Sequence, residues 1–274
     1  MSQTPSTRIA FIGGGNMASA IIGGLIGRGL PADHITVVEP FEAARTALKA
    51  KFGIDALPSA TEALAGADLV VWATKPQTFK DATSDVAPHT THALHLSVAA
   101  GITTGSIAQW LGTHRIVRAM PNTPALVGKG MTGLFACPEV DAPGQALIER
   151  VIGTTGQFVW VDAEDKLDAV TALSGSGPAY VFLFLEAMTQ AGVDMGLTAE
   201  QSYQLAIATF QGASELAAQS DEPASVLRER VTSKGGTTHA AITHMQQTRL
   251  PQHFIDALRK AETRAKELAA EFGK

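Results

Sequence analysis

Apolar residues in the first part of the chain come in short runs that are separated by polar stretches with helical spacing. Such runs, when closed by glycine, proline or a charged residue, are typical of buried strands. They occupy 8–13, 35–39, 68–73, 94–99, 115–120 and 157–161. Helical spacing follows the first two runs, over 16–30 and 41–52, and helices also fit between the later ones. Strand and helix therefore alternate, which predicts an α/β fold with a parallel, doubly wound sheet.

The pattern changes after Asp162, where the strand-like runs stop. Helical spacing then covers 165–173, 179–191, 199–219, 224–231 and 251–272. Pro178 suits the first turn of its helix, and Ser174 or Ser176 can cap that helix. We therefore expect two domains, an α/β domain over residues 1–163 and an all-α domain over residues 164–274.

Composition and charge narrow the class of protein. A length of 274 residues is consistent with two domains. The net charge of −5, with no basic block, gives no support for nucleic-acid or anionic-membrane partners. Residues 1–8 are polar and lack a signal-peptide core, and the most apolar run, 179–185, is too short to span a bilayer. We expect a cytoplasmic protein whose single cysteine, Cys137, is buried and inert.

A glycine-rich loop follows the first expected strand and opens the first helix. Its sequence, Gly13-Gly14-Gly15-Asn16-Met17-Ala18, fits the pattern G-x-G-x-x-A. Gly13 allows a tight turn, and Gly15 lets the backbone approach a pyrophosphate at the positive end of the helix. Because strand, loop, helix and second strand follow in the required order, the loop predicts a Rossmann-type dinucleotide site. Its expected contacts are Ile12, Gly13, Gly14, Gly15, Asn16 and Met17.

Glu39 ends the second expected strand, and its role has two interpretations. An acid at this position can accept hydrogen bonds from an adenosine ribose, which favours NAD over NADP. It can equally be a solvated carboxylate. Arg45 and Lys49 are the nearby cations that can bind a 2′-phosphate, or they are ordinary exposed charges of the next helix. The residues alone leave the coenzyme preference open.

Two further loops follow expected strands and point to the same crevice, because ligands of open α/β sheets bind outside the carboxyl ends of the strands. One contains Ala73, Thr74, Lys75 and Pro76, and the other contains Ala99 and Ala100. Lys75 can reach the cofactor or the substrate, or it can lie on the surface at the start of a helix.

Two loops of the helical part are rich in small residues. Residues 173–180, Leu-Ser-Gly-Ser-Gly-Pro-Ala-Tyr, can approach a ligand closely or serve a crossing of two helices. Residues 231–240 join two helices, and Gly235-Gly236 stands before hydroxyl residues at a helix start. This arrangement favours an anion-binding nest, although a capped turn between helices is the other interpretation.

Four segments together resemble the pyrroline-5-carboxylate reductase family. They are 11–18, 120–124, 173–180 and 231–238, in the order and spacing of that family. Lys234 stands where the family often has proline, while both glycines and Thr238 remain. The resemblance implies a Rossmann domain followed by a helical dimerisation domain. It also implies a ring of dimers, commonly a decamer, with each active site between one subunit's cofactor and its partner's helical domain.

The same resemblance implies hydride transfer from NADPH, or less efficiently NADH, to the C=N bond of Δ1-pyrroline-5-carboxylate, which yields proline. The ring nitrogen can be protonated by solvent, so positioning and exclusion of water are the main tasks of the enzyme. We expect the backbone N–H groups of Gly235, Gly236 and Thr237, with the Ser233 hydroxyl, to hold the substrate carboxylate. Thr238 is the expected catalytic residue, contacting the ring nitrogen. Asn122 and Thr123 are expected near the nicotinamide.

Other charged residues have open roles. Asp221 or Glu222 can face the positive ring nitrogen or be solvated loop acids, and His239 lies beside the expected site. The histidines show no metal-ligand pattern, and no metal is expected.

Two alternatives compete with the reductase. A β-hydroxyacid dehydrogenase also joins a Rossmann domain to a helical one but needs a lysine base, for which Lys166 and Lys234 are the candidates. Neither lies in that family's helical motif. A dinucleotide-sensing regulatory protein would need the first glycine loop and not the second.

Overall fold

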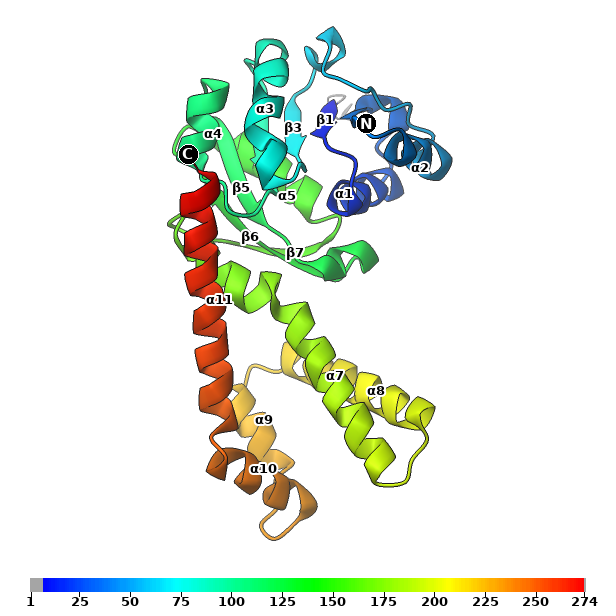
Figure 1. Cartoon of the computed structure of the whole chain (residues 1–274), viewed down its shortest axis with the longest axis vertical. Helices are drawn as coiled ribbons and strands as arrows, with labels where there is room; N and C mark the ends of the chain where they lie inside the picture. Colours follow the sequence, from blue (N-terminus) through cyan, green and yellow to red (C-terminus); the bar gives the residue numbers. More distant parts are fainter. Residues whose placement is uncertain (1–6, 274) are drawn as a thin grey trace. The chain divides into compact units, whose positions relative to one another are not determined.

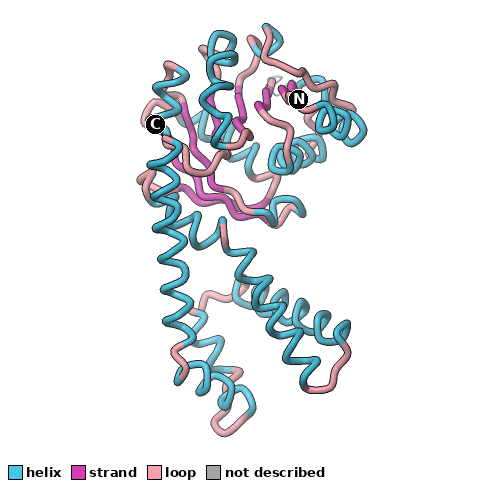
Figure 2. The backbone as a smooth tube through the Cα atoms, in the orientation of Figure 1, coloured by secondary structure: helices cyan, strands magenta, loops and turns pink. Residues whose placement is uncertain are grey.

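The computed structural model describes residues 7–273, which form two compact units (Figures 1 and 2). The first unit contains the chain up to Ser176 together with the residues from Ala261 onward, and the second is Gly177–Lys260. The polar N-terminal segment, 1–8, lies largely outside the described residues. In the described part, no helix is long and apolar enough to cross a membrane.

The first unit is built on a seven-stranded sheet in the order β2-β1-β3-β4-β5-β6-β7. The first five strands are parallel, as predicted, and all of them start and end within two residues of the expected bounds. The strands are β1 Ile9–Ile12, β2 Ile35–Val38, β3 Leu69–Trp72, β4 Leu94–Ser97, β5 Ile116–Met120, β6 Gly130–Ala136 and β7 Gly156–Trp160.

Strand β6 departs from the expectation of a wholly parallel sheet, because it runs antiparallel to β5 and parallel to β7. The sequence pattern gave no strand here, since Gly130, Thr132 and Gly133 interrupt the apolar run. Only residues 121–129 connect β5 to β6. A parallel crossover needs a dozen residues or more, so this short connection forces the antiparallel return.

Helices cover both faces of the sheet, and period-two alternation along the strands divides the core in two. Ile9 and Phe11 pack in one cluster with α1 (Asn16–Gly27), α2 (Glu42–Phe52) and α5 (Ala142–Ile152). The intervening Ala10 and Ile12 pack on the other face with α3 (Pro76–Val86) and α4 (Thr104–Leu111). The doubly wound architecture is confirmed.

Cys137 and His95 are two buried residues of this unit whose side chains can titrate. Cys137 is buried, as predicted, and burial raises the pKa of its thiol. His95 on β4 is also buried, and its Nδ1 accepts a hydrogen bond from Trp72 Nε1 at 3.1 Å. Loss of hydration lowers the pKa of His95 to about 4, so the ring is neutral at pH 7.

The segment after β7 belongs to the first unit, although the helical pattern begins there. It forms the short helix α6 (Lys166–Val170) and a π-helix, Thr171–Gly175, in place of the single helix expected over 165–173. Leu167 is fully buried, and a Cβ added to Gly133 would lie 2.8 Å from Val170 Cγ1. This close packing on β6 explains why the compact unit extends beyond the expected boundary near residue 163.

The second unit is entirely helical. It contains α7 (Gly177–Asp194), α8 (Ala199–Ala218), α9 (Ala224–Arg230), α10 (Thr237–Gln247) and the first half of α11 (Leu250–Phe272). Pro178 lies in the first turn of α7, as predicted. Of the two serines proposed as its cap, Ser176 directly precedes α7, whereas Ser174 lies within the π-helix.

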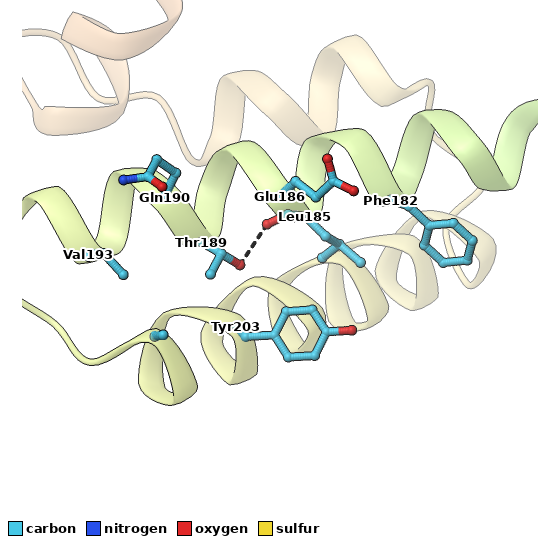
Figure 3. Close-up of a pocket in the computed structure, with 8 residues that line it drawn as sticks. Phe182, Leu185, Glu186, Thr189, Gln190, Val193 and Tyr203 are labelled. Atoms are coloured by element: carbon cyan, nitrogen blue, oxygen red, sulfur yellow. Dashed lines mark hydrogen bonds between the residues drawn. The ribbon is translucent and has the colours of Figure 1, made fainter.

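Helices α7 and α8 pack against each other, yet they leave much apolar surface open. Within Gly177–Lys260, all of which the structure describes, only Leu185, Gly192, Ser202 and Ala206 are buried. Figure 3 shows Leu185 and Thr189 of α7 beside Tyr203 of α8, with Phe182 along the same groove. Large exposed apolar residues on these two helices include Phe182, Leu183, Leu205 and Leu216.

Candidate active site

The first glycine loop is fixed between the ends of three neighbouring strands. Gly13 has a φ of +96°, and its N–H donates to the Val38 carbonyl oxygen at 2.8 Å. A Cβ added to Gly13 would lie 2.7 Å from the Ala73 carbonyl oxygen. The positive φ and the close backbone both require glycine at this position.

Gly15 differs from Gly13 because its surroundings are open. It is the N-cap of α1, with φ −71° and ψ −167°, and no side chain caps the helix. A Cβ added to Gly15 would have no neighbour within 4 Å. The first-turn N–H groups of α1 lack intrahelical acceptors and face this space, so an anion can reach them.

Glu39 is buried and holds the glycine loop. Its Oε2 accepts a hydrogen bond from the Gly14 N–H at 2.8 Å, and its Oε1 accepts one from the Phe41 N–H at 2.9 Å. Only 6% of the residue is exposed, so the interpretation as a solvated carboxylate is wrong. Sequence reasoning missed this role because the contact joins residues 25 positions apart.

The two cations near Glu39 have different environments. Arg45 Nη1 donates to the carbonyl oxygens of Glu39 at 3.0 Å and Pro40 at 2.7 Å, which places the guanidinium beside the end of β2. Lys49 instead forms an exposed ion pair with Asp55 at 2.5 Å. Arg45 is therefore the better placed of the two for a group bound at this strand end.

The loop after β3 contacts the glycine loop and contains an unpartnered polar atom. The Ala73 N–H donates to the Ile12 carbonyl oxygen at 2.8 Å. Lys75 is the exposed N-cap of α3, which begins at Pro76. Among the described residues, Thr74 Oγ1 is buried and has no hydrogen-bond partner. Buried hydroxyl groups nearly always form a hydrogen bond, so a polar group of a ligand is a suitable partner for Thr74 Oγ1.

The loop after β4 completes this edge of the sheet. The Val98 N–H donates to the carbonyl oxygen of Trp72, the last residue of β3, at 3.0 Å, which continues the ladder one residue beyond β4. Ala99 is buried and Ala100 is exposed. Because β1, β3 and β4 are neighbours, the three predicted loops lie together at the carboxyl ends of the strands.

Asn122 lies at the same edge, but its amide is already engaged. Its Nδ2 donates to the Ser174 carbonyl oxygen at 3.3 Å and to Ser174 Oγ at 3.1 Å. Its Oδ1 accepts from the Met131 N–H at 2.9 Å. Both amide hydrogens are used, so Asn122 joins the loop after β5 to the π-helix. A direct contact with the nicotinamide stays a prediction, as it does for the exposed Thr123.

An ion pair that sequence reasoning missed secures the start of the segment after β7. Glu164 Oε1 accepts from Arg118 Nη1 at 3.0 Å and from the Thr104 N–H at 2.7 Å. Glu164 Oε2 accepts from Thr104 Oγ1 at 2.6 Å. The carboxylate therefore sits at the N-terminus of α4, where the helix dipole also stabilises it.

The second glycine loop, between α9 and α10, lies in the second unit. Gly235 has a φ of +79°, and Gly236 is the N-cap of α10, which has no side-chain cap. A Cβ added to Gly236 would lie 2.8 Å from Ser233 Oγ. Thr237 opens the helix and is exposed, and Thr238 is half-buried.

One expected donor of this loop is not free. The Gly236 N–H donates to the Ser233 carbonyl oxygen at 3.0 Å and closes the turn. Its expected contact with the substrate carboxylate stays a prediction. Thr237 and Thr238, in the first turn of α10, have N–H groups without intrahelical acceptors.

Glu222 and Lys166, two of the other charged candidates, form ion pairs. Glu222 forms an ion pair with Arg230 through both carboxylate oxygens, while Asp221 is exposed. Lys166 pairs with Asp162 at 2.5 Å, and this hydrogen bond raises the pKa of the lysine. With a raised pKa, Lys166 stays protonated near neutral pH and is less available to accept a proton. His239 is exposed.

Comparison with known proteins covers both units. A family model described as "Pyrroline-5-carboxylate reductase dimerisation" matches residues 164–268, and one described as "NADP oxidoreductase coenzyme F420-dependent" matches residues 8–101. A pyrroline-5-carboxylate reductase from Pseudomonas aeruginosa is 43% identical over 268 residues, which cover 97% of this chain and 98% of that protein.

Solved structures agree with the sequence relatives. A pyrroline-5-carboxylate reductase from Coxiella burnetii has 40% identity and a TM-score of 0.91, covering 96% of this chain and 99% of that one. A pyrroline carboxylate reductase from Plasmodium falciparum, with NADP bound, has 27% identity and a TM-score of 0.86, covering 97% of this chain and all of that one. These similarities favour the reductase over the β-hydroxyacid dehydrogenase. The chain belongs to the pyrroline-5-carboxylate reductase family.

Proposed function

We propose that this chain reduces Δ1-pyrroline-5-carboxylate to L-proline, the last step of proline biosynthesis, with NADPH as the preferred hydride donor and NADH as a slower one. The observation that carries the proposal is similarity along almost the whole chain to enzymes of this name. The NADP in the Plasmodium falciparum structure supports the choice of coenzyme.

The residues at the carboxyl edge of the sheet fit a nicotinamide dinucleotide. The open first turn of α1, starting at Gly15, would hold the pyrophosphate. Thr74 Oγ1 offers an unused polar atom beside it, and Arg45 offers a positive charge for a 2′-phosphate. The bound coenzyme supplies the hydride, while the chain binds and orients it.

The second glycine loop is the proposed substrate site. Its open donors, the backbone N–H groups of Gly235 and Thr237, would hold the carboxylate with help from Ser233 Oγ. The Thr238 hydroxyl would orient the ring nitrogen. The imine is basic enough to take its proton from water, so the chain needs no dedicated acid among its own side chains.

The proposed assembly follows from the open apolar surface of the second unit. We assign residues 1–163 to the dinucleotide-binding domain and 164–274 to the helical domain, supported by the family model that starts at residue 164. A dimer would form through the helical domain, and five dimers would form a decamer in the cytoplasm. Each active site would combine one subunit's coenzyme with the partner's second glycine loop.

A spectrophotometric assay tests this function. NADPH oxidation is followed with Δ1-pyrroline-5-carboxylate, and NADP⁺ reduction is followed with a panel of 3-hydroxy acids. Turnover with the imine alone is expected. Turnover with a hydroxy acid and none with the imine would show that the proposed function is wrong.

A further inference from the structure

The first unit contains a cavity of about 450 Å³ at the end of β1 and α1 that lies farthest from the first glycine loop. Ile9, at the start of β1, and Leu25, near the end of α1, line it together with Val151 of α5. All three side chains are buried, so the floor is apolar. The glycine loop follows the last residue of β1 and precedes the first of α1. The 12 residues of α1 therefore separate the two places by about 18 Å.

The rim of this cavity is positively charged. Arg28 and Arg150 line it and carry this charge, His34 lines it too, and none of its lining residues among 7–273 is acidic. Arg28 Nη2 donates to the Gly153 carbonyl oxygen at 2.5 Å, which fixes its guanidinium at the rim. None of the ion pairs found among residues 7–273 includes either arginine. In a chain of net charge −5, this is a local concentration of unneutralised positive charge.

His34 adds an observation that is independent of the arginines. Within the described part of the chain, its Nδ1 is buried and has no hydrogen-bond partner. Buried polar atoms in folded proteins nearly always have a partner, so an orphaned one requires an explanation. An imidazole nitrogen can donate or accept a hydrogen bond and therefore suits a polar ligand group.

We propose that this cavity is a second ligand site, separate from the coenzyme and substrate sites, which binds a small organic anion. The apolar body of the ligand would lie on Ile9, Leu25 and Val151. Its carboxylate, sulfonate or phosphate group would meet the guanidinium groups of Arg28 and Arg150, with His34 Nδ1 as a further partner. The volume lies in the range of small-molecule pockets, and an apolar floor with a few polar groups is the usual composition of such sites.

The test uses the whole enzyme with saturating NADPH and the probe 1-naphthalenesulfonate, measured by isothermal titration. Its uncharged counterpart, 1-naphthalenemethanol, separates the anionic contribution from apolar binding. Arg150→Gln removes one charge of the rim. Arg115→Gln is the matched control, because Arg115 is also an exposed arginine of the first unit but does not line the cavity.

Wild type and Arg115→Gln are expected to bind the sulfonate equally, and Arg150→Gln about tenfold more weakly, with turnover unchanged. The alcohol should bind both arginine variants alike. Equal affinity of wild type and Arg150→Gln for the sulfonate would place the probe elsewhere and overturn the proposal, as would no binding at millimolar concentration.

A crystallographic measurement keeps the test decisive if Arg150→Gln folds poorly. Crystals of the wild-type enzyme are soaked with 5-iodonaphthalene-1-sulfonate, and the anomalous signal of iodine locates the probe. A peak beside Ile9 and Val151 is the expected result. Peaks confined to the coenzyme edge of the sheet or to the helical unit would contradict the proposal.

Discussion

The two glycine loops of this chain open helices in the same way but are held by different surroundings. Neither α1 nor α10 has a side-chain cap, and each begins just after a glycine with positive φ, Gly13 or Gly235. The first loop is fixed by strand ends and by the buried Glu39. The second is closed by its own turn, from the Gly236 N–H to the Ser233 carbonyl oxygen, and by bonds from Thr232 to the end of α9. The first site is therefore preformed within its unit, while the second depends on its surroundings for rigidity.

The same contrast holds for the two units. The first has an apolar core on each face of its sheet. The second, Gly177–Lys260, has only four buried residues, two of which are the small Gly192 and Ser202. A unit of this size with so little interior needs another surface to cover it. The second glycine loop, which is the proposed substrate site, thus belongs to the unit whose apolar surface needs a partner.

The largest effect is expected from breaking that assembly. Leu205 of α8 is 57% exposed in the single chain. Leu205→Asp would place a charge in each half of a symmetric interface, at a cost of several kcal/mol per copy. We expect monomers and at least about a hundredfold loss of activity at micromolar concentration.

Light scattering coupled to chromatography measures the assembly of this variant. Val127→Asp in the first unit is the matched control, since Val127 is also an exposed apolar residue, at 75%. The control should remain assembled and active. A fully active Leu205→Asp monomer would refute the dependence of the second loop on a partner.

The next largest effect separates the two roles of glycine in the first loop. Gly15→Val is expected to keep the fold, because φ is −71° and the added atoms enter open space. That space is the proposed site of the pyrophosphate, so NADPH affinity should fall by about a hundredfold or more. Gly13→Val should instead destabilise the fold, given a φ of +96° and the nearby Ala73 carbonyl oxygen. Thermal unfolding and a fluorescence titration distinguish the two; unchanged NADPH affinity in Gly15→Val would exclude this loop as the phosphate site.

The sequence pattern predicted much of the architecture of both units. Local periodicity and strand-end loops are properties of short segments, which explains why the five parallel strands, the loops at their carboxyl ends and α7, α8, α9 and α11 were found. Strand β6 was missed because Gly130, Thr132 and Gly133 break its apolar run. The segment 171–175 was missed as a π-helix because its pattern does not differ from that of an ordinary helix.

The contacts that hold the candidate site were beyond sequence reasoning. Glu39 with Gly14, Asn122 with Ser174 and Arg118 with Glu164 are pairs separated by 25 to 52 positions. No local period relates such residues, and only the folded sheet brings them together. For the same reason the engagement of the Gly236 N–H with Ser233 was not anticipated, since it depends on the conformation of a turn.

A pH measurement tests the core of the first unit on its own. The pKa of His95 is lowered to about 4 by burial, from 6.5. His95 therefore takes up a proton near pH 6.5 in the unfolded chain but only near pH 4 in the folded chain. The free energy of unfolding should fall by about 3 kcal/mol across that window and level off below it.

His95→Asn removes this titration while keeping an acceptor for Trp72 Nε1, so its stability should change less with pH. All three tryptophans, Trp72, Trp110 and Trp160, lie in the first unit. Urea unfolding followed by tryptophan fluorescence therefore reports that unit alone. Parallel curves for wild type and variant between pH 6.5 and 4 would show that His95 is not the responsible group.

A smaller effect on turnover is expected from removing the Thr238 hydroxyl, just after the second glycine loop. Thr238→Ala should lower kcat/KM for the imine by roughly two- to a hundredfold and leave NADPH affinity unchanged. Total loss is not expected, because water can replace the hydroxyl and the imine can be protonated before it binds. Thr237→Ala is the control, since Thr237 is expected to act through its backbone. If Thr238→Ala has wild-type kinetics from about pH 6 to 9, Thr238 has only a structural role at the start of α10.

The smallest effect is expected in the coenzyme selectivity of Glu39→Gln. If the Glu39 carboxylate bound the ribose hydroxyls, its neutral variant would weaken NADH binding selectively. In the structure both carboxylate oxygens accept backbone N–H groups, from Gly14 and Phe41, and only 6% of the residue is exposed. Glutamine keeps one acceptor and turns an N–H₂ group toward the other backbone donor, so the loop should loosen for both coenzymes alike. The ratio of kcat/KM values for NADPH and NADH should then stay within about twofold of wild type while both values fall.

Arg45→Gln is the informative contrast, because it removes the positive charge beside the end of β2 and should lower kcat/KM for NADPH only. A Glu39→Gln enzyme that loses NADH selectively would mean that this carboxylate leaves its backbone partners to bind the ribose, and that the first loop is less rigidly preformed than its hydrogen bonds indicate.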